Sequence, residues 1–213
     1  MQPYHKIPTI YKRDPETKYK TLIEGEFATP ELEYLAENTW VFTEKVDGTN
    51  IRVHWDGNEV SFYGRTDKAN IPFPLLTALF DMFPAEKFAD FDSPITLYGE
   101  GYGNKIQEPV GSAYIPDGVG FILFDVSIND WWLQRLDALA IAQKFGILKT
   151  PTIGWGTLFD AIYMAKAGFN SLISPSGSTL RSEGIVLRPQ VELKDRAGRR
   201  IICKIKTKDF QVD

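Results

Sequence analysis

The segment between Trp40 and Gly64 constrains the fold more than any other part of the chain. It contains three short runs in which apolar and polar residues alternate, at residues 40–45, 51–55 and 59–64. Asp56-Gly57-Asn58, between the last two runs, is typical of a hairpin turn. The segment therefore predicts antiparallel strands. Because the hairpin arms are nearly equal in length, Arg65 should return to the neighbourhood of residues 45–50.

Helices are expected at four places among further strands. Thr29 can cap a helix whose first position is Pro30, and Gly146 and Gly168 are expected helix stops. The other expected helices lie within residues 73–83, 130–145 and 158–167. Further strands are expected at residues 95–100, 120–125, 184–188 and 199–206.

The order of these elements indicates the fold class. Helices are scattered among hairpins rather than alternating strictly with strands, which favours α+β with antiparallel sheets flanked by helices. Residues 1–213 are expected to form a single domain. The apolar face of the helix at 130–145 is expected to hold Trp132, Leu136, Leu139 and Ala140.

Composition excludes several classes of protein. No apolar run approaches the ~20 residues that span a membrane, and the N-terminus lacks the apolar segment of a secretory signal. Cys203, the single cysteine, cannot form an internal disulfide, and with His5 and His54 it provides too few ligands for a zinc site. The chain therefore reads as cytoplasmic, and any metal should be a hard cation bound by oxygen.

Charge adds one further limit. The net charge of −4 argues against indiscriminate nucleic-acid binding. Residues 194–208 nevertheless carry seven Lys and Arg residues against Asp195 alone. This segment is either a solvated hairpin tip or a surface that contacts phosphates.

Polar residues stand at the ends of several expected strands. Lys45 ends one strand, and Gly48 just after it would permit close approach of a phosphate to the backbone. Glu100 lies between two glycines, and Glu183 precedes another strand. Lysine at a strand end can act as a nucleophile, although the Lys-x-Asp-Gly pattern alone is weak.

Two lysines share one face of the last expected strand. Lys204 and Lys206 are two residues apart, and successive side chains of a strand point to opposite faces. Cys203 alternates with them and is expected to face the core. Two lysines on one face of an otherwise apolar strand indicate a polyanionic ligand.

The ordered motifs resemble those of the covalent nucleotidyltransferase superfamily, which includes ATP-dependent ligases and mRNA-capping enzymes. Between Glu44 and Lys206 they are Lys-x-Asp-Gly, a following Arg, Gly-Glu-Gly, Phe-Asp-Val, Glu-Gly-Ile-Val and Lys-x-Lys. Glu-Lys-Val-Asp-Gly-Thr-Asn and Tyr-Gly-Glu-Gly-Tyr-Gly most resemble the RNA ligase family, in its RNA ligase 2-like group of phage and bacterial repair enzymes. DNA ligases and capping enzymes usually carry an arginine where this chain has Asn50.

This resemblance implies a nucleotidyltransferase domain, here without the C-terminal domain that relatives append. It implies that Lys45 attacks the α-phosphate of ATP and carries AMP as a phosphoramidate. AMP would pass to a 5′-phosphate, and a 3′-hydroxyl would displace it. Glu183 and Glu100 would place Mg²⁺ or Mn²⁺, while Lys204 and Lys206 would hold phosphates during catalysis. Neighbouring cations would favour the neutral, nucleophilic form of a lysine.

The resemblance also implies nucleotide contacts for other residues. Glu44 would read the adenine amino group, and Phe124 would stack on adenine. Asn50, Arg65 and Glu100 would contact sugar and phosphate. The alternative from the residues alone is that Asn50 caps a turn and that Arg65 pairs with Asp47 or Asp67 at the surface.

The favoured function is an ATP-dependent RNA ligase that acts on RNA ends or a nicked duplex. The alternatives are a minimal DNA ligase or capping enzyme, and an adenylyltransferase or RNA-end-binding module that needs a partner to join strands. That partner would supply the C-terminal domain. The chain is expected to be monomeric and not to associate with membranes. If it is phage-encoded, it is expected to lie in the host cytoplasm.

Overall fold

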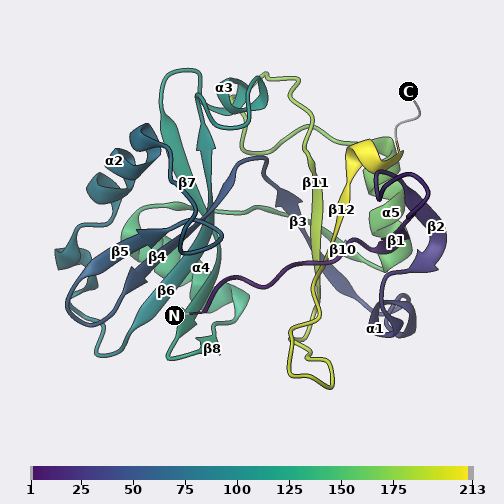
Figure 1. Cartoon of the computed structure of the whole chain (residues 1–213), viewed down its shortest axis with the longest axis horizontal. Coiled ribbons are helices and arrows are strands. Elements are labelled where there is room, and N and C mark those ends of the chain that lie inside the picture. Colours follow the sequence, from purple (N-terminus) through teal and green to yellow (C-terminus); the bar gives the residue numbers. More distant parts are fainter. Residues whose placement is uncertain (1, 211–213) are drawn as a thin grey trace. The chain divides into compact units, whose positions relative to one another are not determined.

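The computed structural model describes residues 2–210, and these form two compact units with a sheet in each (Figure 1). Unit 1 takes its described residues from Met1–His5, Val46–Thr150 and Ile173–Leu180. Unit 2 takes its described residues from Lys6–Lys45, Pro151–Leu172 and Arg181–Asp213. No helix within residues 2–210 is long and apolar enough to cross a membrane.

The sheet of unit 1 has the strand order β5-β4-β6-β7-β8, and β9 pairs with β7. The strands are β4 (Thr49–Trp55), β5 (Val60–Tyr63), β6 (Ile95–Gly103), β7 (Val119–Ile128), β8 (Trp131–Trp132) and β9 (Leu148–Lys149). All pairs are antiparallel except β7–β9. The predicted hairpin is confirmed as β4–β5, in which Arg52 lies opposite Tyr63.

Helices cover one face of this sheet. They are α2 (Phe73–Met82), the 3₁₀ helix η1 (Ala85–Phe88) that follows it, and α4 (Arg135–Phe145), while α3 (Val110–Tyr114) packs in a smaller cluster. Alternate strand residues such as Val53 and Leu97 are fully buried against α2 residues Leu75 and Leu79. Apolar residues at every second strand position thus pack against apolar residues spaced along one helix face, and together they form one core.

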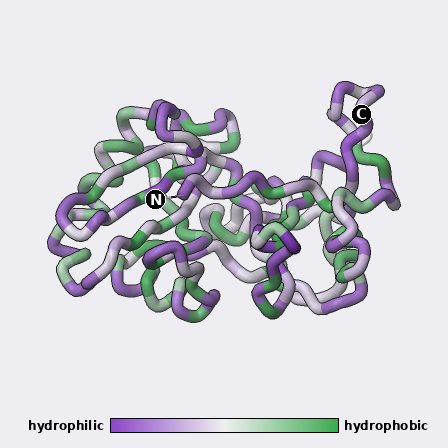
Figure 2. Tube along the Cα trace, turned by 60° about the horizontal axis from the view of Figure 1, so that its bottom comes forward, coloured by the Kyte–Doolittle hydropathy of each residue, from purple (hydrophilic) through white to green (hydrophobic). Residues whose placement is uncertain are grey.

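Unit 2 contains a four-stranded sheet of order β10-β3-β11-β12 and a two-stranded sheet β1-β2. The strands are β1 (Tyr11–Arg13), β2 (Leu22–Phe27), β3 (Trp40–Lys45), β10 (Thr152–Gly156), β11 (Gly184–Pro189) and β12 (Cys203–Lys206). Its helices are α1 (Pro30–Tyr34), α5 (Leu158–Ala167) and the 3₁₀ helix η2 (Thr207–Phe210). Apolar residues of α5 pack on Phe42, Ile185 and Cys203, so α5 covers one face of the larger sheet. Colouring by hydropathy shows apolar and polar residues interleaved along the chain, as amphipathic elements require (Figure 2).

The predicted capping signals are confirmed. The Thr29 side chain accepts a hydrogen bond from the Leu32 backbone N–H at the start of α1. α5 ends before Gly168 as expected, and its start carries a capping box of Thr157 and Asp160 that was not predicted. The predicted α+β class with antiparallel sheets is confirmed.

Two element boundaries were predicted wrongly. Residues 130–134 are not helical, because Trp131–Trp132 pairs with β7 as strand β8. The last strand begins at Cys203 rather than residue 199, because residues 190–202 form a long hairpin loop, the yellow-green loop at the bottom of Figure 1. Both boundaries depend on how strands pair with one another, and local sequence patterns do not reveal strand pairing.

The buried face of α4 also differs from the prediction. Leu136 is 79% exposed and Leu139 41% exposed, whereas Ala138, Ala142 and Phe145 are buried. Both sets have helical spacing, so periodicity alone cannot choose between them. In the structure, packing against the sheet buries the stripe of α4 that carries the small alanine side chains.

We predict that Leu79→Ala in α2 destabilises the protein by about 2–5 kcal/mol, because it removes a fully buried side chain and leaves a cavity. The matched substitution Leu136→Ala in α4 should change stability by less than about 0.5 kcal/mol. Urea unfolding followed by circular dichroism measures both. Equal losses for the two variants would contradict the observed orientation of α4.

Candidate active site

Three charged side chains meet at one end of the four-stranded sheet of unit 2. Lys45 of β3 and Lys206 of β12 both lie opposite Gly184 of β11 in the strand register. Glu183 precedes Gly184, and its carboxylate oxygens lie 2.5 Å from the ammonium nitrogens of Lys45 and Lys206. A Cβ at Gly184 would lie 2.1 Å from the carbonyl oxygen of Ile205. Glycine is therefore required for β11 and β12 to approach closely beside this carboxylate.

The two lysines decide the protonation state of Glu183. Its side chain is only 10% exposed, and this burial raises the pKa of the carboxyl group. The positive charges of Lys45 and Lys206 outweigh burial, so the pKa lies below its usual value. Glu183 is therefore an anion that bridges two cations.

Lysines occupy the face of this sheet that α5 does not cover. Cys203 and Ile205 of β12 are buried in the core beneath α5, and Lys204 and Lys206 alternate with them on the opposite face. We call this side, which also bears Lys45, the lysine face. The predictions that Lys204 and Lys206 share a face and that Cys203 faces the core are confirmed. Burial also raises the pKa of the Cys203 thiol, which disfavours a reactive thiolate.

Glu44 points away from the lysine face. Its carboxylate is buried and accepts hydrogen bonds from Ser171 Oγ at 2.5 Å and from the Leu172 backbone N–H at 2.8 Å. Burial raises the pKa of this carboxyl group even though both hydrogen bonds act to lower it. Ser171 and Leu172 are 127 and 128 residues away in sequence, so no local pattern identified them. An adenine contact by Glu44 stays a prediction.

Unit 1 carries the other predicted nucleotide ligands. Asn50 of β4 lies directly opposite Glu100 of β6, so both half-buried side chains are on the same face of the sheet. A Cβ at Gly48 would lie 2.3 Å from the carbonyl oxygen of Gly101 and 2.9 Å from Glu100 Cγ. The sequence suggested that Gly48 makes room for a phosphate. In the structure Gly48 makes room for β6.

Phe124 occupies an irregular position in β7. Tyr98 pairs with Asp125 and Gly99 with Leu123, which leaves Phe124 as the extra residue of a β-bulge. Its ring meets the edge of Tyr4 at a centroid distance of 4.9 Å, and the Tyr4 hydroxyl donates a hydrogen bond to Asp125. Tyr4 lies 121 residues from Asp125, and sequence reasoning missed it. Bulges re-aim side chains, which suits a ring that serves a ligand.

Arg65 follows β5 and is exposed. Continued by two residues, the β4–β5 register would place it opposite Asn50, as the hairpin arms predicted. Asp67 does not pair with Arg65. It pairs instead with the fully buried Arg52 at 2.7 Å, and Arg65 makes no ion pair within residues 2–210.

These residues fit a nucleotide in two respects. Lys204 and Lys206 place positive charge on one face of unit 2, and the buried Asn50 Oδ1 in unit 1 has no hydrogen-bond partner within the described residues. A buried acceptor without a partner is costly, so Asn50 suits a donor such as a ribose hydroxyl.

The carboxylates also suit a hard divalent cation. The described part of the chain contains no group of three or more His, Cys, Asp or Glu residues that could hold a metal. Mg²⁺ is usually bound by one or two carboxylates together with substrate phosphates and water. The ionised Glu183 in unit 2 and Glu100 in unit 1 are each able to supply such a ligand.

Comparison with solved structures shows that this chain shares its fold with part of Naegleria gruberi RNA ligase. The structure of Naegleria gruberi RNA ligase with PPi matches with a TM-score of 0.65 and 19% identity over 85% of this chain and 53% of that chain. A mutant of the same ligase with ATP and Mn matches with a TM-score of 0.66, 18% identity, and coverage of 85% and 52%. An apo mutant matches with a TM-score of 0.67, 16% identity, and coverage of 98% and 59%.

The chain belongs to the RNA ligase family, since the model of that family, described as RNA ligase, matches residues 38–206. The matched range begins two residues before β3 and ends at Lys206, so it contains every predicted site residue. The chain spans about half the length of the solved ligases it resembles. A search of curated protein sequences found no match.

We predict that Glu183→Gln lowers stability at neutral pH and that this loss shrinks in acid. The folded carboxyl group has a lowered pKa, so it binds a proton less readily than the unfolded one. Its stabilising effect is present above the unfolded value of 4.5 and is lost as pH falls through the folded pKa.

Urea unfolding of the wild type and the variant between about pH 7 and pH 3 tests this prediction. The stability gap should narrow toward the acid end. Glu37→Gln, an exposed substitution in the same unit, should leave stability unchanged at each pH. A gap that stays constant or widens in acid would contradict the ionised bridge.

Proposed function

We propose that this protein is an ATP-dependent RNA ligase that joins 5′-phosphate and 3′-hydroxyl ends through a lysyl-AMP intermediate. The observation that carries the proposal is the bridge of Glu183 between Lys45 and Lys206, within a chain of the RNA ligase family. It places a strand-end lysine beside a second cation and an ionised carboxylate.

In the first step Lys45 Nζ attacks the α-phosphorus of ATP. A nitrogen–phosphorus bond forms as the bond to the leaving pyrophosphate breaks, and AMP stays on Lys45. Only the neutral amine can attack. Attack therefore requires Lys45 to leave its contact with Glu183 and to give up a proton.

Lys204 and Lys206 offset the negative charge that develops on the α-phosphate and on the departing pyrophosphate. Glu183 and Glu100 are the residues that would hold Mg²⁺ or Mn²⁺. A divalent ion supplies further charge neutralisation when bound. Asn50, Arg65 and Phe124 take the nucleoside and phosphate contacts implied by the family motifs, and Glu44 takes the adenine contact.

In the later steps AMP moves from Lys45 to the 5′-phosphate of a nucleic-acid end. The 3′-hydroxyl oxygen of the other end then attacks that phosphate, a phosphodiester bond forms, and AMP leaves. We propose that the ends are RNA, aligned in a nicked duplex, because Asn50 and the Tyr98–Gly103 motif are typical of RNA ligases. The monomeric state and cytoplasmic location remain predictions.

We predict that incubation with ATP and magnesium adds AMP to Lys45, detected as a mass increase of the intact chain and located by peptide mass spectrometry. Lys45→Ala should abolish the adduct, and Lys206→Ala should slow its formation by roughly 10²–10³-fold, since a cation that stabilises the departing phosphate is lost. Glu183→Ala and Glu100→Ala should suppress the adduct as well.

Lys12→Ala is the matched control, because Lys12 makes an exposed ion pair with Glu26 in the same unit. It should leave adduct formation unchanged. An adduct that persists in Lys45→Ala, or that forms with GTP rather than ATP, would contradict the assignment.

We predict that the chain seals a nick with RNA at the 3′-hydroxyl side faster than the matched all-DNA nick. A 2′-hydroxyl beside the reacting end offers a donor and an acceptor that DNA lacks. Sealing rates for duplexes that differ only in the sugars flanking the nick measure the preference. Faster sealing of DNA would favour the DNA ligase alternative, and adenylylation without sealing would favour a module that needs a partner.

A further inference from the structure

A tryptophan stands exposed on the lysine face of unit 2. Trp155 of the edge strand β10 is 64% exposed and lies directly opposite Val41 of β3. Its neighbours Gly154 and Gly156 face the other way, since a Cβ on them would meet Met164 and Asp160 of α5. The indole therefore projects from the same side of the sheet as Lys45. Tryptophan is highly buried on average, and an exposed indole offers a flat surface on which a base can stack.

Trp155 lies within reach of the reactive lysine. Val41 and Lys45 are four residues apart on the same strand, which is roughly 13 Å at the usual rise per residue. Trp155 therefore lies on the same face of the sheet as Lys45 but toward the opposite end of the sheet.

That end of the sheet carries a cationic loop. Gly156 pairs with Trp40, and Trp40 pairs with Pro189, the last residue before the basic hairpin (residues 190–202). Both acidic residues of the basic hairpin are neutralised internally. Glu192 pairs with Arg200, and Asp195 pairs with Arg199.

Three cations of the basic hairpin are exposed, and one of them, Arg199, is paired with Asp195. Lys194 and Arg196 make no ion pair with any residue that the structure describes. They give the basic hairpin a local positive charge in a chain of net charge −4. Arg200, by contrast, is buried against Glu192 and is not available to a phosphate.

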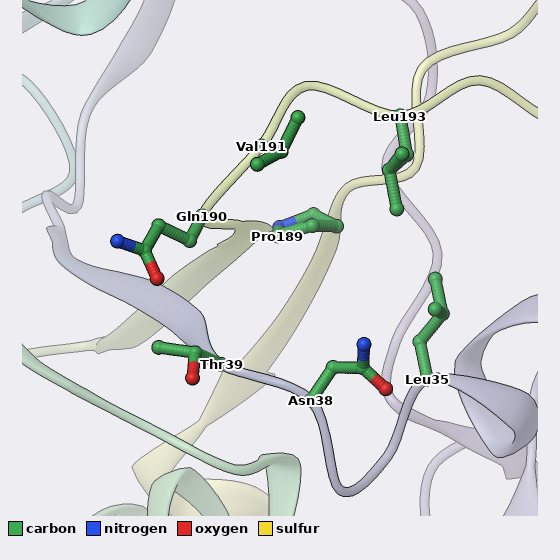
Figure 3. Close-up of a pocket in the computed structure, with 7 residues that line it drawn as sticks. All are labelled: Leu35, Asn38, Thr39, Pro189, Gln190, Val191 and Leu193. Carbon is green, nitrogen blue, oxygen red and sulfur yellow. The ribbon is translucent and has the colours of Figure 1, made fainter.

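A small cavity of about 230 Å³ opens beside the start of the basic hairpin (Figure 3). Leu35, Pro189 and Leu193 form an apolar wall, and the Asn38 side chain projects toward it. Pro189 lies directly opposite Trp40, whose side chain is in the core under α5, so this cavity opens on the other side of the sheet from Trp155.

We propose that this end of unit 2 binds an unpaired segment of the nucleic-acid substrate. Trp155 stacks on one base, and Lys194 and Arg196 of the basic hairpin contact phosphates. The positive charge of the basic hairpin favours a polyanionic ligand. The exposed indole favours a nucleic acid among polyanions, because every base presents a surface for stacking. The inference rests on the proposed ligase function, because it takes the bound segment to be part of a nucleic-acid substrate that reacts at Lys45.

The test measures binding of a fluorescein-labelled single-stranded oligoribonucleotide to the full chain by anisotropy at fixed salt. Trp155→Ala should raise Kd about tenfold, the typical effect of losing one stacked base. Trp155→Phe retains a ring and should raise Kd less than about threefold. Lys194→Ala with Arg196→Ala should weaken binding and flatten its dependence on salt concentration.

Two controls separate stacking from other effects. Tyr163→Ala removes a 78% exposed aromatic ring from α5, which covers the opposite face of the sheet, and should leave Kd unchanged. An oligomer of the same length with abasic sugars has no base to stack, so the Trp155→Ala penalty should disappear with it.

Equal affinities of the wild type and Trp155→Ala, or a penalty that persists with the abasic oligomer, would overturn the proposal. So would unchanged RNA affinity accompanied by a Trp155-dependent change of oligomeric state in sedimentation, which would assign the surface to a second copy. Adenylylation by ATP needs no oligonucleotide. Its absence in the wild type would therefore reject the proposed function, while the binding series still decides the role of Trp155.

Discussion

The carboxylate of Glu183 holds together two lysines from strands that lie on either side of it. Lys45 and Lys206 pair with the same glycine, Gly184, so the register of β3, β11 and β12 brings two positive charges to one point. Two such charges would repel each other without an anion between them. The bridge lets this end of the sheet carry cationic groups before any phosphate arrives, and the proposed chemistry uses the same three side chains.

The four-stranded sheet separates stability from chemistry by its two faces. On the face under α5, Phe42, Ile185 and Cys203 form an apolar core. On the lysine face, the alternate residues of the same strands bear the charges. A one-residue slip in register would place lysines in the core and apolar groups at the site, so the core enforces the arrangement of the site.

Glycine and irregular backbone shape the polar face of unit 1 in a comparable way. The missing side chain at Gly48 lets its turn pack on Gly101, next to Glu100. The bulge at Phe124 interrupts the pairing of β6 with β7 and leaves that ring against Tyr4. Both features sit beside residues that the family motifs single out, which links the motif glycines to backbone geometry as well as to ligands.

The sequence by itself determined the local features. Hairpin chemistry, capping residues and two-residue alternation act within a few positions, so they predicted the β4–β5 hairpin, α5 and the shared face of Lys204 and Lys206. Motif order also located Lys45 and Glu183, although the 2.5 Å contact between them required the folded sheet.

Only the tertiary structure decided the choices among equivalent local patterns. In the folded protein, alanines of α4 rather than Leu136 face the core. Asp67 forms an ion pair with Arg52, and Glu44 accepts a hydrogen bond from Ser171. Each choice depends on which distant segments compete for the same space or hydrogen bond. Such contacts join residues up to more than a hundred positions apart, and neither periodicity nor turn chemistry reaches across that separation.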